Sequence, residues 1–398
     1  MKIGILTAGG IAPCLSASVG RLIKQYTELF PKVEIIGYLH GYKGLLQGNS
    51  IEITNSVRDN AELLYEFGGS PFGNSRVKLT NIENCVKMGY ISKGQNPLQV
   101  ASEQLKNDGI TILHTIGGDD TNTSAGDLST HLSQHDYSLT VVGIPKTVDN
   151  DVYPIQQTLG AWTASEQGAI FFENVVNENT TSSRQLIIHE VMGRNCGWLT
   201  AETAREYRNR LSKKSFLPDI LVEKSRWDID AVYIPEMEIN LKEEAKRLKQ
   251  LMNEKDCVNI FLSEGAGLES IVTEMEANGD EVKRDAFGHV RLDEINPGQW
   301  FAKQFAGMLN ADKVLVQKSG YFARSSAPNS KDLNLIKETA DMAVVCATNG
   351  ENGVIGLDEN NSGKLSCIDF SRIKGGKPFD FNQQWFTNLL KEIGQIDK

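Results

Sequence analysis

The sequence predicts an α/β fold in which parallel sheets are flanked by helices. Short apolar runs rich in β-branched residues recur along the chain, and amphipathic stretches of helical length separate them. Gly-rich polar sequences follow several of these runs. Strands that alternate with helices in this way are typical of βαβ units, whose helices cover both faces of a parallel sheet. The 398 residues are enough for roughly two to three domains at about 150 residues each.

The predicted elements alternate in order along the chain. Ile3–Leu6 is an apolar strand, and Ala12–Leu29 reads as a helix with Pro13 near its first turn. Further strands are predicted at Val33–Leu39, Ile110–Ile116, Leu139–Ile144, Leu186–Val191, Ala231–Ile234 and Val258–Leu262. Helices are predicted at Ser124–Gln134, Thr158–Asn177 and Leu241–Glu254. The charged segment Leu268–Pro297 is expected to form a helix followed by an excursion.

Charge and hydropathy exclude two classes of partner. The 41 Lys and Arg residues and 51 Asp and Glu residues give a net charge of -10, and no basic run interrupts this acidic excess. Nucleic acid is therefore not expected as a partner, because affinity for a phosphate backbone depends mainly on clustered cations. No stretch of 18 apolar residues is present, so no segment is expected to span a membrane.

The N-terminus and the cysteines lead us to expect a cytoplasmic protein. The first ten residues read as a strand and lack the charged head and long apolar core of a signal peptide. The six cysteines include no CxxC pair, which favours reduced thiols over disulfides or a zinc site.

Ligands of parallel sheets bind beyond the carboxyl ends of the strands, so the loops after the predicted strands are the candidate sites. In the first of these loops, Gly9 and Gly10 stand between a strand and a helix. Two glycines there let the backbone approach a phosphate, and the helix N-terminus offers free N–H groups. A plain tight turn would explain the two glycines equally well.

The second loop places Asp119 and Asp120 directly after Gly117 and Gly118. Adjacent carboxylates at the end of a strand suit Mg²⁺ facing a phosphate, since Mg²⁺ uses one or two protein carboxylates and keeps other oxygen ligands. A helix N-cap at Asp120 or Thr121 is the alternative. Capping explains one of these residues but not both aspartates beside the two glycines.

The third loop, residues 145–151, holds Lys146, Thr147, Asp149 and Asp151 within six positions. Phosphoryl transfer needs a cation for the migrating group, a metal ligand, and a base for the attacking hydroxyl. A solvated Asn-Asp turn is the alternative for this loop. Together with the first two loops, it indicates a Mg²⁺-dependent phosphoryl-transfer site whose donor and acceptor remain open.

The fourth loop offers Arg194 beside Gly193 at a strand's end. An arginine in this position suits a phosphate or a sugar hydroxyl, because the guanidinium group presents several N–H donors in a fixed plane. A solvated arginine is the commoner explanation for such a motif when it stands alone.

Five motifs, taken in order, resemble the 6-phosphofructokinase family. They are Gly-Gly-Asp-Asp at 117–120, Pro-Lys-Thr-Val-Asp-Asn-Asp at 145–151, Met-Gly-Arg at 192–194, Tyr-Ile-Pro-Glu at 233–236 and Tyr-Phe-Ala-Arg at 321–324. The likeness covers roughly residues 1–375. Each motif alone is unspecific, whereas the ordered set is specific. The first loop departs from the pattern at Ile11 and Cys14, where many relatives have an acidic residue and a glycine.

The details resemble the pyrophosphate-using branch of the family. ATP-using members have Gly-Gly-Asp-Gly and Pro-Gly-Thr, whereas this chain has Asp120 and Lys146 at the variable positions. A carboxylate at 120 would repel the α-phosphate of ATP. Lys146 would stabilise charge on the phosphoryl group in flight. The resemblance thus implies Mg²⁺-dependent, reversible transfer from pyrophosphate to the 1-hydroxyl of fructose 6-phosphate.

The resemblance also implies roles for the residues of the donor and catalytic loops. Asp149 is the candidate base that accepts the proton of the 1-hydroxyl, and Asp119 would hold Mg²⁺. The implied donor-binding residues are Gly10, Arg76, Asp120 and Lys146. Of these, Asp120 and Lys146 are also expected to act in catalysis with Asp149.

The implied sugar-binding residues come from four motifs. Thr147 would orient the substrate, Glu236 would accept hydrogen bonds from hydroxyls, and Arg324 with Tyr321 would clamp the 6-phosphate. The full set is Thr147, Val148, Asp149, Met192, Gly193, Arg194, Glu236, Tyr321, Phe322, Ala323 and Arg324. For Tyr321 an aromatic contact at a subunit interface is the alternative.

The resemblance implies two α/β lobes with parallel sheets and an active site in the interlobe cleft. We expect residues 1–145 to form the donor lobe, with part of 266–310 returning to it, and residues 146–265 and 311–398 to form the sugar-phosphate lobe. A homodimer or homotetramer is expected. An ATP-dependent 6-phosphofructokinase, a kinase of a related sugar phosphate and a catalytically silent regulatory subunit remain as alternatives.

Overall fold

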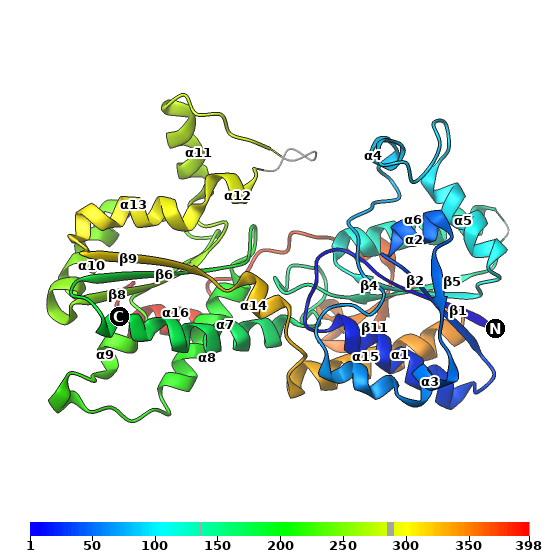
Figure 1. Ribbon diagram of the computed structural model, residues 1–398, viewed down its shortest axis with the longest axis horizontal. Coiled ribbons are helices and arrows are strands. Elements are labelled where there is room, and N and C mark those ends of the chain that lie inside the picture. The colour runs from blue at the N-terminus through cyan, green and yellow to red at the C-terminus, as the bar shows by residue number, and fades with distance from the viewer. Residues whose placement is uncertain (136, 285–289, 398) are drawn as a thin grey trace. The chain divides into compact units, whose positions relative to one another are not determined.

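The computed structural model describes residues 1–135, 137–284 and 290–397, which fold into two compact units (Figure 1). Unit 1 comprises Met1–Thr163 and Arg324–Lys377. Unit 2 comprises Ala164–Ala323 and Pro378–Lys398. Among the described residues, no helix combines the length and the apolar character that a membrane span requires.

This division differs from the expected lobe boundaries in three places. Residues 324–377 belong to unit 1 rather than to the lobe predicted for the sugar, because their strand β10 (Gly353–Asp358) pairs with β5 (Thr140–Pro145). The described residues of 266–310 belong to unit 2 and do not return to unit 1. The crossing expected near residue 145 lies at residue 163.

Unit 1 is built on a seven-stranded sheet with the order β11-β10-β5-β4-β1-β2-β3. Its five central strands run parallel, whereas β3 and β11 are antiparallel edges. The register aligns Ile3 with Ile112, and Ile112 with Thr140. The strands not yet given bounds are β1 (Lys2–Thr7), β2 (Glu34–Tyr38), β3 (Ser50–Glu52), β4 (Ile112–Gly117) and β11 (Lys364–Ile368).

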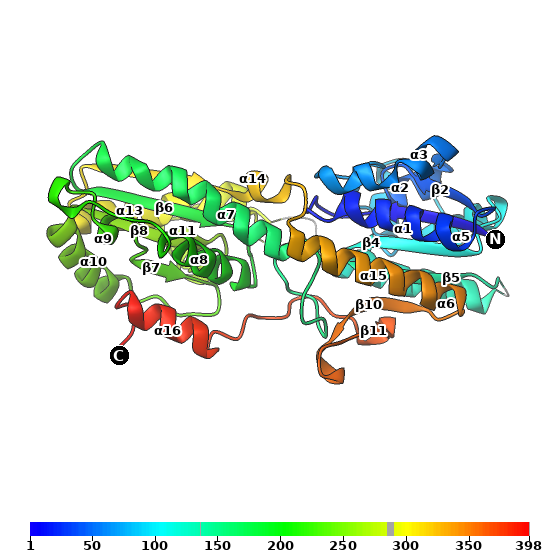
Figure 2. The same ribbon diagram turned by 90° about the horizontal axis from the view of Figure 1, so that it is seen from below.

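Helices cover both faces of this sheet. Figure 1 shows α1, α3 and α15 on one face and α2, α5 and α6 on the other, and Figure 2 shows α1 and α15 side by side. Their bounds are α1 (Leu15–Leu29), α2 (Tyr42–Gln47), α3 (Asn55–Asp59), α4 (Ile82–Lys87), α5 (Pro97–Asn107), α6 (Asp119–Gln134) and α15 (Ser330–Thr348). Short 3-10 helices occupy Ala61–Glu66, Glu359–Asn361 and Phe370–Arg372.

Unit 2 is built on a four-stranded, fully parallel sheet with the order β7-β8-β6-β9. The strands are β6 (Gln185–Val191), β7 (Ala231–Tyr233), β8 (Cys257–Ser263) and β9 (Lys313–Lys318). Its helices are α7 (Ala161–Val175), α8 (Trp198–Leu211), α9 (Lys224–Trp227), α10 (Leu241–Lys255), α11 (Leu268–Ala277), α12 (Leu292–Ile295), α13 (Pro297–Leu309), α14 (Gly320–Arg324) and α16 (Gln384–Glu392). Val176–Thr180 and Pro218–Ile220 are 3-10 helices.

The two faces of the unit 2 sheet have different cores. Helices α10 and α13 bury an apolar core that includes Leu248 and Phe305. On the other face the ring of His189 lies among aromatic side chains of α7, α8 and β8, with Phe172 stacked on it at 5.4 Å. Burial lowers the pKa of His189 to about 3, so its ring is neutral at physiological pH.

The predicted fold class is confirmed, and all seven predicted strands are present within two residues of their expected ends. Helix α1 begins at Leu15 rather than Ala12, so Pro13 precedes the helix instead of lying in its first turn. Helix α6 begins at Asp119, five residues before the expected Ser124, which places both aspartates in its first turn. The helix expected in the charged segment is α11; residues 285–289 of that segment lie outside the described residues.

Asp332, in the first turn of α15, ties this helix to the end of the segment after β5. Its Oδ1 accepts the backbone N–H of Gly160 at 3.1 Å, and its Oδ2 accepts the N–H and the hydroxyl of Thr163 at 2.7 and 2.6 Å. The residue is fully buried, and burial raises the pKa of its carboxyl group. This carboxylate therefore joins two parts of unit 1 that are distant in sequence.

We predict that Asp332→Ala lowers the free energy of unfolding by about 3 kcal/mol, because it leaves the buried donors of Gly160 and Thr163 without an acceptor. Urea unfolding followed by circular dichroism measures this change. Glu28→Ala is the control: Glu28 is exposed, makes only a 3.8 Å ion pair with Lys24, and should change the free energy by less than about 1 kcal/mol. Equal losses in the two variants would contradict the assigned role of Asp332.

Candidate active site

The loop after β1 lies among the ends of the neighbouring parallel strands. The N–H of Ala8 donates to the carbonyl of Ile116 in β4 at 2.9 Å, and the N–H of Gly9 donates to the carbonyl of Ser75 at 2.9 Å. The Nδ2 of Asn74 donates to the carbonyl of Gly9 at 3.2 Å. The loop expected to approach a phosphate is thus fixed at the carboxyl edge of the sheet.

Three cationic side chains converge on Gly10. A Cβ at this position would lie 1.9 Å from Nη2 of Arg324 and 3.7 Å from Nη2 of Arg76. Lys146 Nζ donates to the Gly10 carbonyl at 2.6 Å, and Arg324 Nε donates to the Ile11 carbonyl at 2.9 Å. The Arg324 guanidinium thus occupies the space that a side chain at residue 10 would fill, and any larger residue there would have to displace it.

Lys146 is the buried member of this group, with 5% of its surface exposed. The pKa of its ammonium group is lowered to about 8, chiefly by burial, and the positive charges of Arg324 and Arg76 act in the same direction. The negative charge of Asp149 acts in the opposite direction. A cation held this far out of water is strongly attracted to an incoming anion.

The Gly117-Gly118 turn is held in place by Asn122. Its Nδ2 donates to the carbonyls of Gly117 at 3.1 Å and Gly118 at 2.9 Å, and the side chain is fully buried. The backbone N–H of Lys146 donates to the same Gly117 carbonyl at 2.8 Å. The second and third loops therefore share a carbonyl group. No role was expected for Asn122; a Cβ at Gly117 would lie 2.3 Å from Oγ1 of its neighbour Thr121.

Asp119 and Asp151 form a neighbouring pair of carboxylates. Asp119 packs against the backbone of Gly375, and the pKa of Asp151 is raised, first by burial and then by the negative charge of Asp119. Thr147 Oγ1 donates to Asp151 Oδ1 at 3.2 Å and accepts the backbone N–H of Asp149 at 3.2 Å. Two carboxylates that repel each other in a partly buried position are a suitable pair of oxygen ligands for a dication.

Asp120 has a partner that the sequence analysis missed. Its Oδ1 lies 2.8 Å from Nζ of Lys78, and 60% of its side chain is exposed. Lys78 follows no predicted strand and belongs to no recognised motif, so no local signal indicates this pairing. The Asp120 carboxylate thus forms an ion pair with Lys78.

Asn150 and Thr158 stabilise the rest of the third loop. Asn150 Oδ1 accepts the N–H of Thr158 at 2.8 Å, and the Thr158 hydroxyl donates to the carbonyl of Thr147 at 2.8 Å. Val148 is buried. Hydrogen bonds at Thr147 and at Asn150 therefore fix the backbone that positions the side chains of Thr147 and Asp149.

In unit 2, Met192, Gly193 and Arg194 follow the end of β6. The Ser263 hydroxyl donates to the carbonyl of Gly193, and Glu264 Oε1 accepts the Gly193 N–H at 3.4 Å. Burial raises the pKa of Glu264, while the positive charge of Arg194 lowers it. Glu264 was not predicted; it stands just after β8, at the same edge of the sheet as Arg194.

Glu236 is predicted to bind sugar hydroxyls, and the structure shows it capping a helix. Its carboxylate accepts the N–H of Gly197 at 3.0 and 3.1 Å and the N–H of Phe379 at 2.7 Å. Gly197 is the N-cap of α8, where a negative charge is favourable. The carboxylate keeps part of its capacity as an acceptor, since its two oxygens together offer about four lone-pair positions.

The residues predicted for the sugar phosphate at 321–324 are distributed over both units. Tyr321 is 84% exposed and Phe322 is exposed, whereas Ala323 is buried. The side chain of Met192 packs on Gly320, so the Met-Gly-Arg and Tyr-Phe-Ala segments meet within unit 2. Arg324 is the first residue of the second segment of unit 1, and its guanidinium lies on the loop predicted for the donor, as described above.

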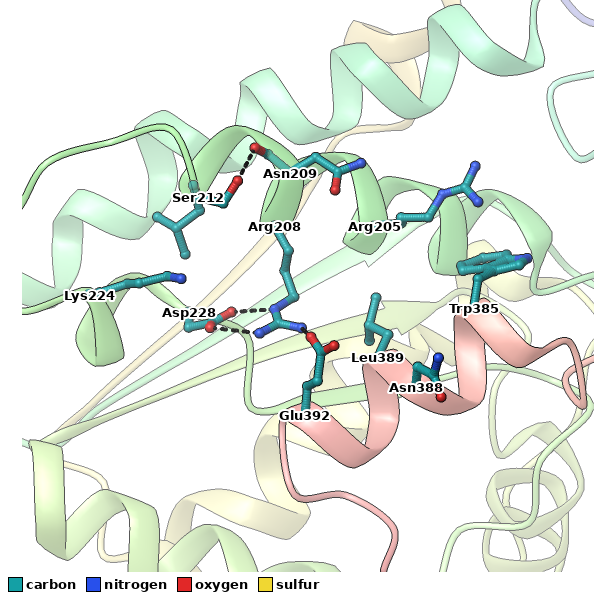
Figure 3. Close-up of a pocket in the computed structure, with 11 residues that line it drawn as sticks. Arg205, Arg208, Asn209, Ser212, Lys224, Asp228, Trp385, Asn388, Leu389 and Glu392 are labelled. Carbon is teal, nitrogen blue, oxygen red and sulfur yellow. Dashed lines mark hydrogen bonds and ion pairs between the residues drawn. The ribbon is translucent and has the colours of Figure 1, made fainter. Parts of the chain in front are cut away.

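A pocket of about 320 Å³ in unit 2 contains none of the predicted site residues (Figure 3). It lies between α8 and α16, and Arg208 crosses it to reach both Asp228 and Glu392. Arg205 lies over the ring of Trp385 at 4.4 Å from its centre. The two arginines of this pocket therefore already have partners, and its lining includes none of the residues expected to carry the transfer.

The family model described as phosphofructokinase matches residues 2–347. The pyrophosphate–fructose 6-phosphate 1-phosphotransferase of Methylotuvimicrobium alcaliphilum is 59% identical, over 99% of this chain and 96% of that protein. The protein of the same name from Mastigamoeba balamuthi is 56% identical, over 99% of this chain and 96% of that protein.

Solved structures agree in fold. A pyrophosphate-dependent phosphofructokinase from Marinobacter aquaeolei superposes with a TM-score of 0.72 at 18% identity, covering 99% of this chain and 91% of that one. The ordered motifs, the loops at the carboxyl ends of the strands and the full-length match lead to one conclusion. The chain belongs to the phosphofructokinase family.

Proposed function

We propose that this protein reversibly transfers a phosphoryl group from pyrophosphate to the 1-hydroxyl of D-fructose 6-phosphate, giving fructose 1,6-bisphosphate and phosphate. The names of its close relatives support the proposal. The observation that carries it is the approach of two cationic side chains, Arg76 and Lys146, to Gly10. A small, highly charged donor needs several cations close together on an open backbone.

The donor proposal rests on the charge balance of this loop. Lys146 and Arg76 supply positive charge beside Gly10, where the missing side chain leaves the backbone accessible. Because Lys146 is buried, its charge acts through a medium of low dielectric constant and stabilises the phosphoryl group during transfer. Asp120 would oppose the additional phosphate of a nucleotide donor.

The donor set for a metal ion fits Mg²⁺. Asp119 and Asp151 present neighbouring oxygen ligands, which are of the type and number that Mg²⁺ uses. We therefore propose that these two residues hold Mg²⁺, with water and donor oxygens as its other ligands. When bound, the ion supplies positive charge that neutralises the phosphate oxygens.

In the proposed reaction, the oxygen of the 1-hydroxyl attacks a phosphorus atom of pyrophosphate. The bond between that phosphorus and the bridging oxygen breaks, and inorganic phosphate leaves. Asp149 takes the proton of the hydroxyl, and Thr147 keeps Asp149 in position through its backbone N–H. In the reverse direction Asp149 returns the proton.

For the sugar, we propose binding by residues of both loops and helices. Met192, Gly193 and Arg194 would line the sugar, with hydroxyl hydrogen bonds to the remaining acceptor positions of Glu236. The exposed Tyr321 would bind the 6-phosphate together with Arg324. To do so, Arg324 has to give up its bond to the Ile11 carbonyl. We place the enzyme in the cytoplasm on the strength of its cysteine pattern, and we propose that it forms a homodimer or homotetramer.

We predict that Asp149→Asn lowers kcat by about 10²–10⁴-fold, because a positioned base contributes that much to proton transfer. The dissociation constant for fructose 6-phosphate should change far less, since the amide keeps the shape of the side chain. Steady-state kinetics and calorimetric titration measure the two quantities. A variant with normal turnover would remove Asp149 from the role of base.

We predict that phosphate release by the wild-type protein with Mg²⁺ and fructose 6-phosphate requires pyrophosphate and is negligible with ATP. Asp120→Gly should raise kcat/KM for ATP by about fivefold, since it removes a charge whose repulsion costs about 1 kcal/mol at close range. Lys78→Gln is the matched variant, because it leaves Asp120 without its 2.8 Å partner. If charge controls the choice of donor, Lys78→Gln should lower kcat/KM for ATP below the wild-type value. Gains for ATP in both variants, or in neither, would contradict this explanation.

We predict a basic limb near pH 8 in the pH profile of kcat/KM for pyrophosphate. The pKa of Lys146 is lowered to about 8 in the folded protein, so its positive charge is present below that pH and lost above it. Lys146→Arg should move the limb to higher pH, because arginine stays protonated throughout this range. A limb that does not move in Lys146→Arg would have to be assigned to another group.

A further inference from the structure

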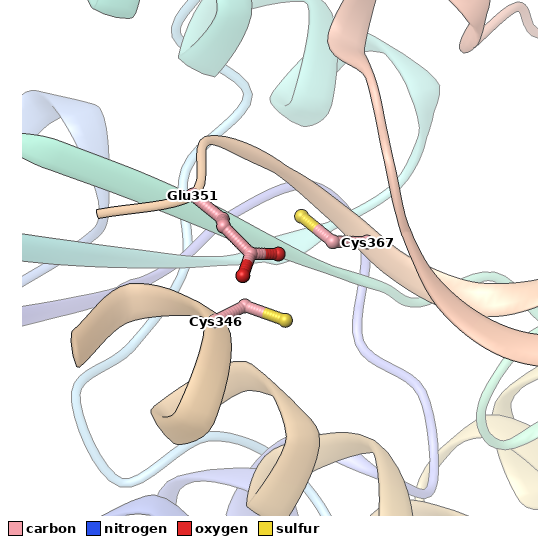
Figure 4. Close-up of side chains that lie close together, drawn as sticks. All are labelled: Cys346, Glu351 and Cys367. Atoms are coloured by element: carbon pink, nitrogen blue, oxygen red, sulfur yellow. The ribbon is translucent and has the colours of Figure 1, made fainter. Parts of the chain in front are cut away.

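Cys346, Glu351 and Cys367 bring two thiols and a carboxylate together in unit 1 (Figure 4). One ligand atom of each residue lies within 4.8 Å of those of the other two. Cys346 belongs to α15, Glu351 follows the end of that helix, and Cys367 belongs to β11. None of the three residues has a role in the proposed phosphoryl transfer.

The end of α15 dictates the contact between Cys346 and Glu351. The N–H of Glu351 donates to the carbonyl of Cys346 at 2.9 Å, and the N–H of Gly350 donates to the carbonyl of Ala347 at 3.2 Å. This is the Schellman pattern, which usually brings an apolar residue of the last turn against an apolar residue after the helix. Here a thiol and a carboxylate occupy those two positions, so the cap presents two metal ligands in place of an apolar contact.

Cys367 reaches the same point from the edge of the sheet. Strand β11 is antiparallel to β10, and a Cβ at Gly353 would lie 2.7 Å from Sγ of Cys367 and 2.5 Å from the carbonyl of Ile368. Any larger residue at 353 would displace the thiol. The backbone of β10 therefore holds Cys367 beside the cap of α15.

The chemistry of this group selects one class of ligand. Thiolates favour soft or borderline cations such as Zn²⁺ and disfavour Mg²⁺ and Ca²⁺. Ligand atoms on a tetrahedral zinc ion lie about 3.5–4 Å apart, given bonds of about 2.0–2.3 Å, so a small contraction of the cluster suffices. Cys346 is 4% exposed, whereas Glu351 is exposed, which gives a cation access from one side.

We propose that Cys346, Glu351 and Cys367 bind one zinc-class divalent cation, with water as the fourth ligand. Binding replaces the two thiol protons with two bonds from sulfur to the metal, and no electron is transferred. The bound ion connects the C-terminal end of α15 to the edge strand β11. Its effect is therefore on the stability of unit 1 and not on the turnover of substrate.

Titration of the full-length, metal-free protein with Co²⁺ tests the proposal, because Co²⁺ bound to thiolates gives a near-ultraviolet charge-transfer band. We expect one equivalent of Co²⁺ to saturate this band and Zn²⁺ to displace it. Zn²⁺ should also raise the melting temperature by roughly 5 °C at 100 times its dissociation constant. Absence of the band, or saturation at another stoichiometry, would overturn the proposal.

Matched variants locate the site. Cys346→Ser and Cys367→Ser should each abolish the two-thiolate band, whereas Glu351→Gln should keep it with weaker affinity. Cys85→Ser is the control, because Cys85 is another buried cysteine of unit 1 outside the cluster. It should retain the band. A band that survives both cluster serine variants would assign the metal elsewhere.

A measurement on the unaltered protein covers the case in which a variant fails to fold. Zn²⁺ should slow the alkylation of Cys367, which is partly exposed, and leave that of Cys85 unchanged. Equal rates with and without Zn²⁺ would refute the site. Recovery of a disulfide between Cys346 and Cys367 that persists in the presence of Zn²⁺ would do the same.

Discussion

The burial of a positive charge beside an open backbone is the constraint on which unit 1 depends. The buried ammonium group of Lys146 donates a hydrogen bond to the Gly10 carbonyl at 2.6 Å. The Arg324 guanidinium lies beside it, in the space that a side chain at residue 10 would fill. Three cations at close range repel one another, so the arrangement stores electrostatic energy until an anion arrives. The phosphate groups of a small donor relieve this repulsion when they bind. Hydrogen bonds from Gly9 to Ser75 and from Asn74 to Gly9 hold the loop in place.

Much of this organisation could be predicted from sequence because it is local. Apolar runs identified the strands, and polar residues directly after them identified three of the loops that the structure places at the carboxyl edge of the unit 1 sheet. The Lys78–Asp120 pair could not be predicted, since Lys78 lies in a segment without regular structure whose position depends on tertiary packing. The position of Arg324 on the Gly10 loop also depends on packing between segments more than 300 residues apart.

The cysteine cluster shows a second limit of sequence reasoning. Spacing rules for metal sites search for ligands a few residues apart, whereas Cys346 and Cys367 are separated by a helix cap, a strand and a turn. Only the pairing of β10 with β11 and the Schellman end of α15 bring them together. Glu236 shows the converse: a motif position with an expected role in binding is also a structural acceptor for two backbone N–H groups. A single side chain can thus meet two requirements that the sequence pattern does not separate.

The chain passes between the two units at residues 163, 323 and 377, and this path has a consequence for synthesis on the ribosome. Strand β5 is complete at residue 145, but its neighbour β10 ends at residue 358 and the covering helix α15 at residue 348. During translation β5 therefore remains an unpaired edge while the whole of the second unit's first segment is being made. Unpaired strand edges of this kind can pair with other chains, which leads to aggregation. The part of the chain up to β5 thus has to be kept from aggregating until residue 358 has emerged.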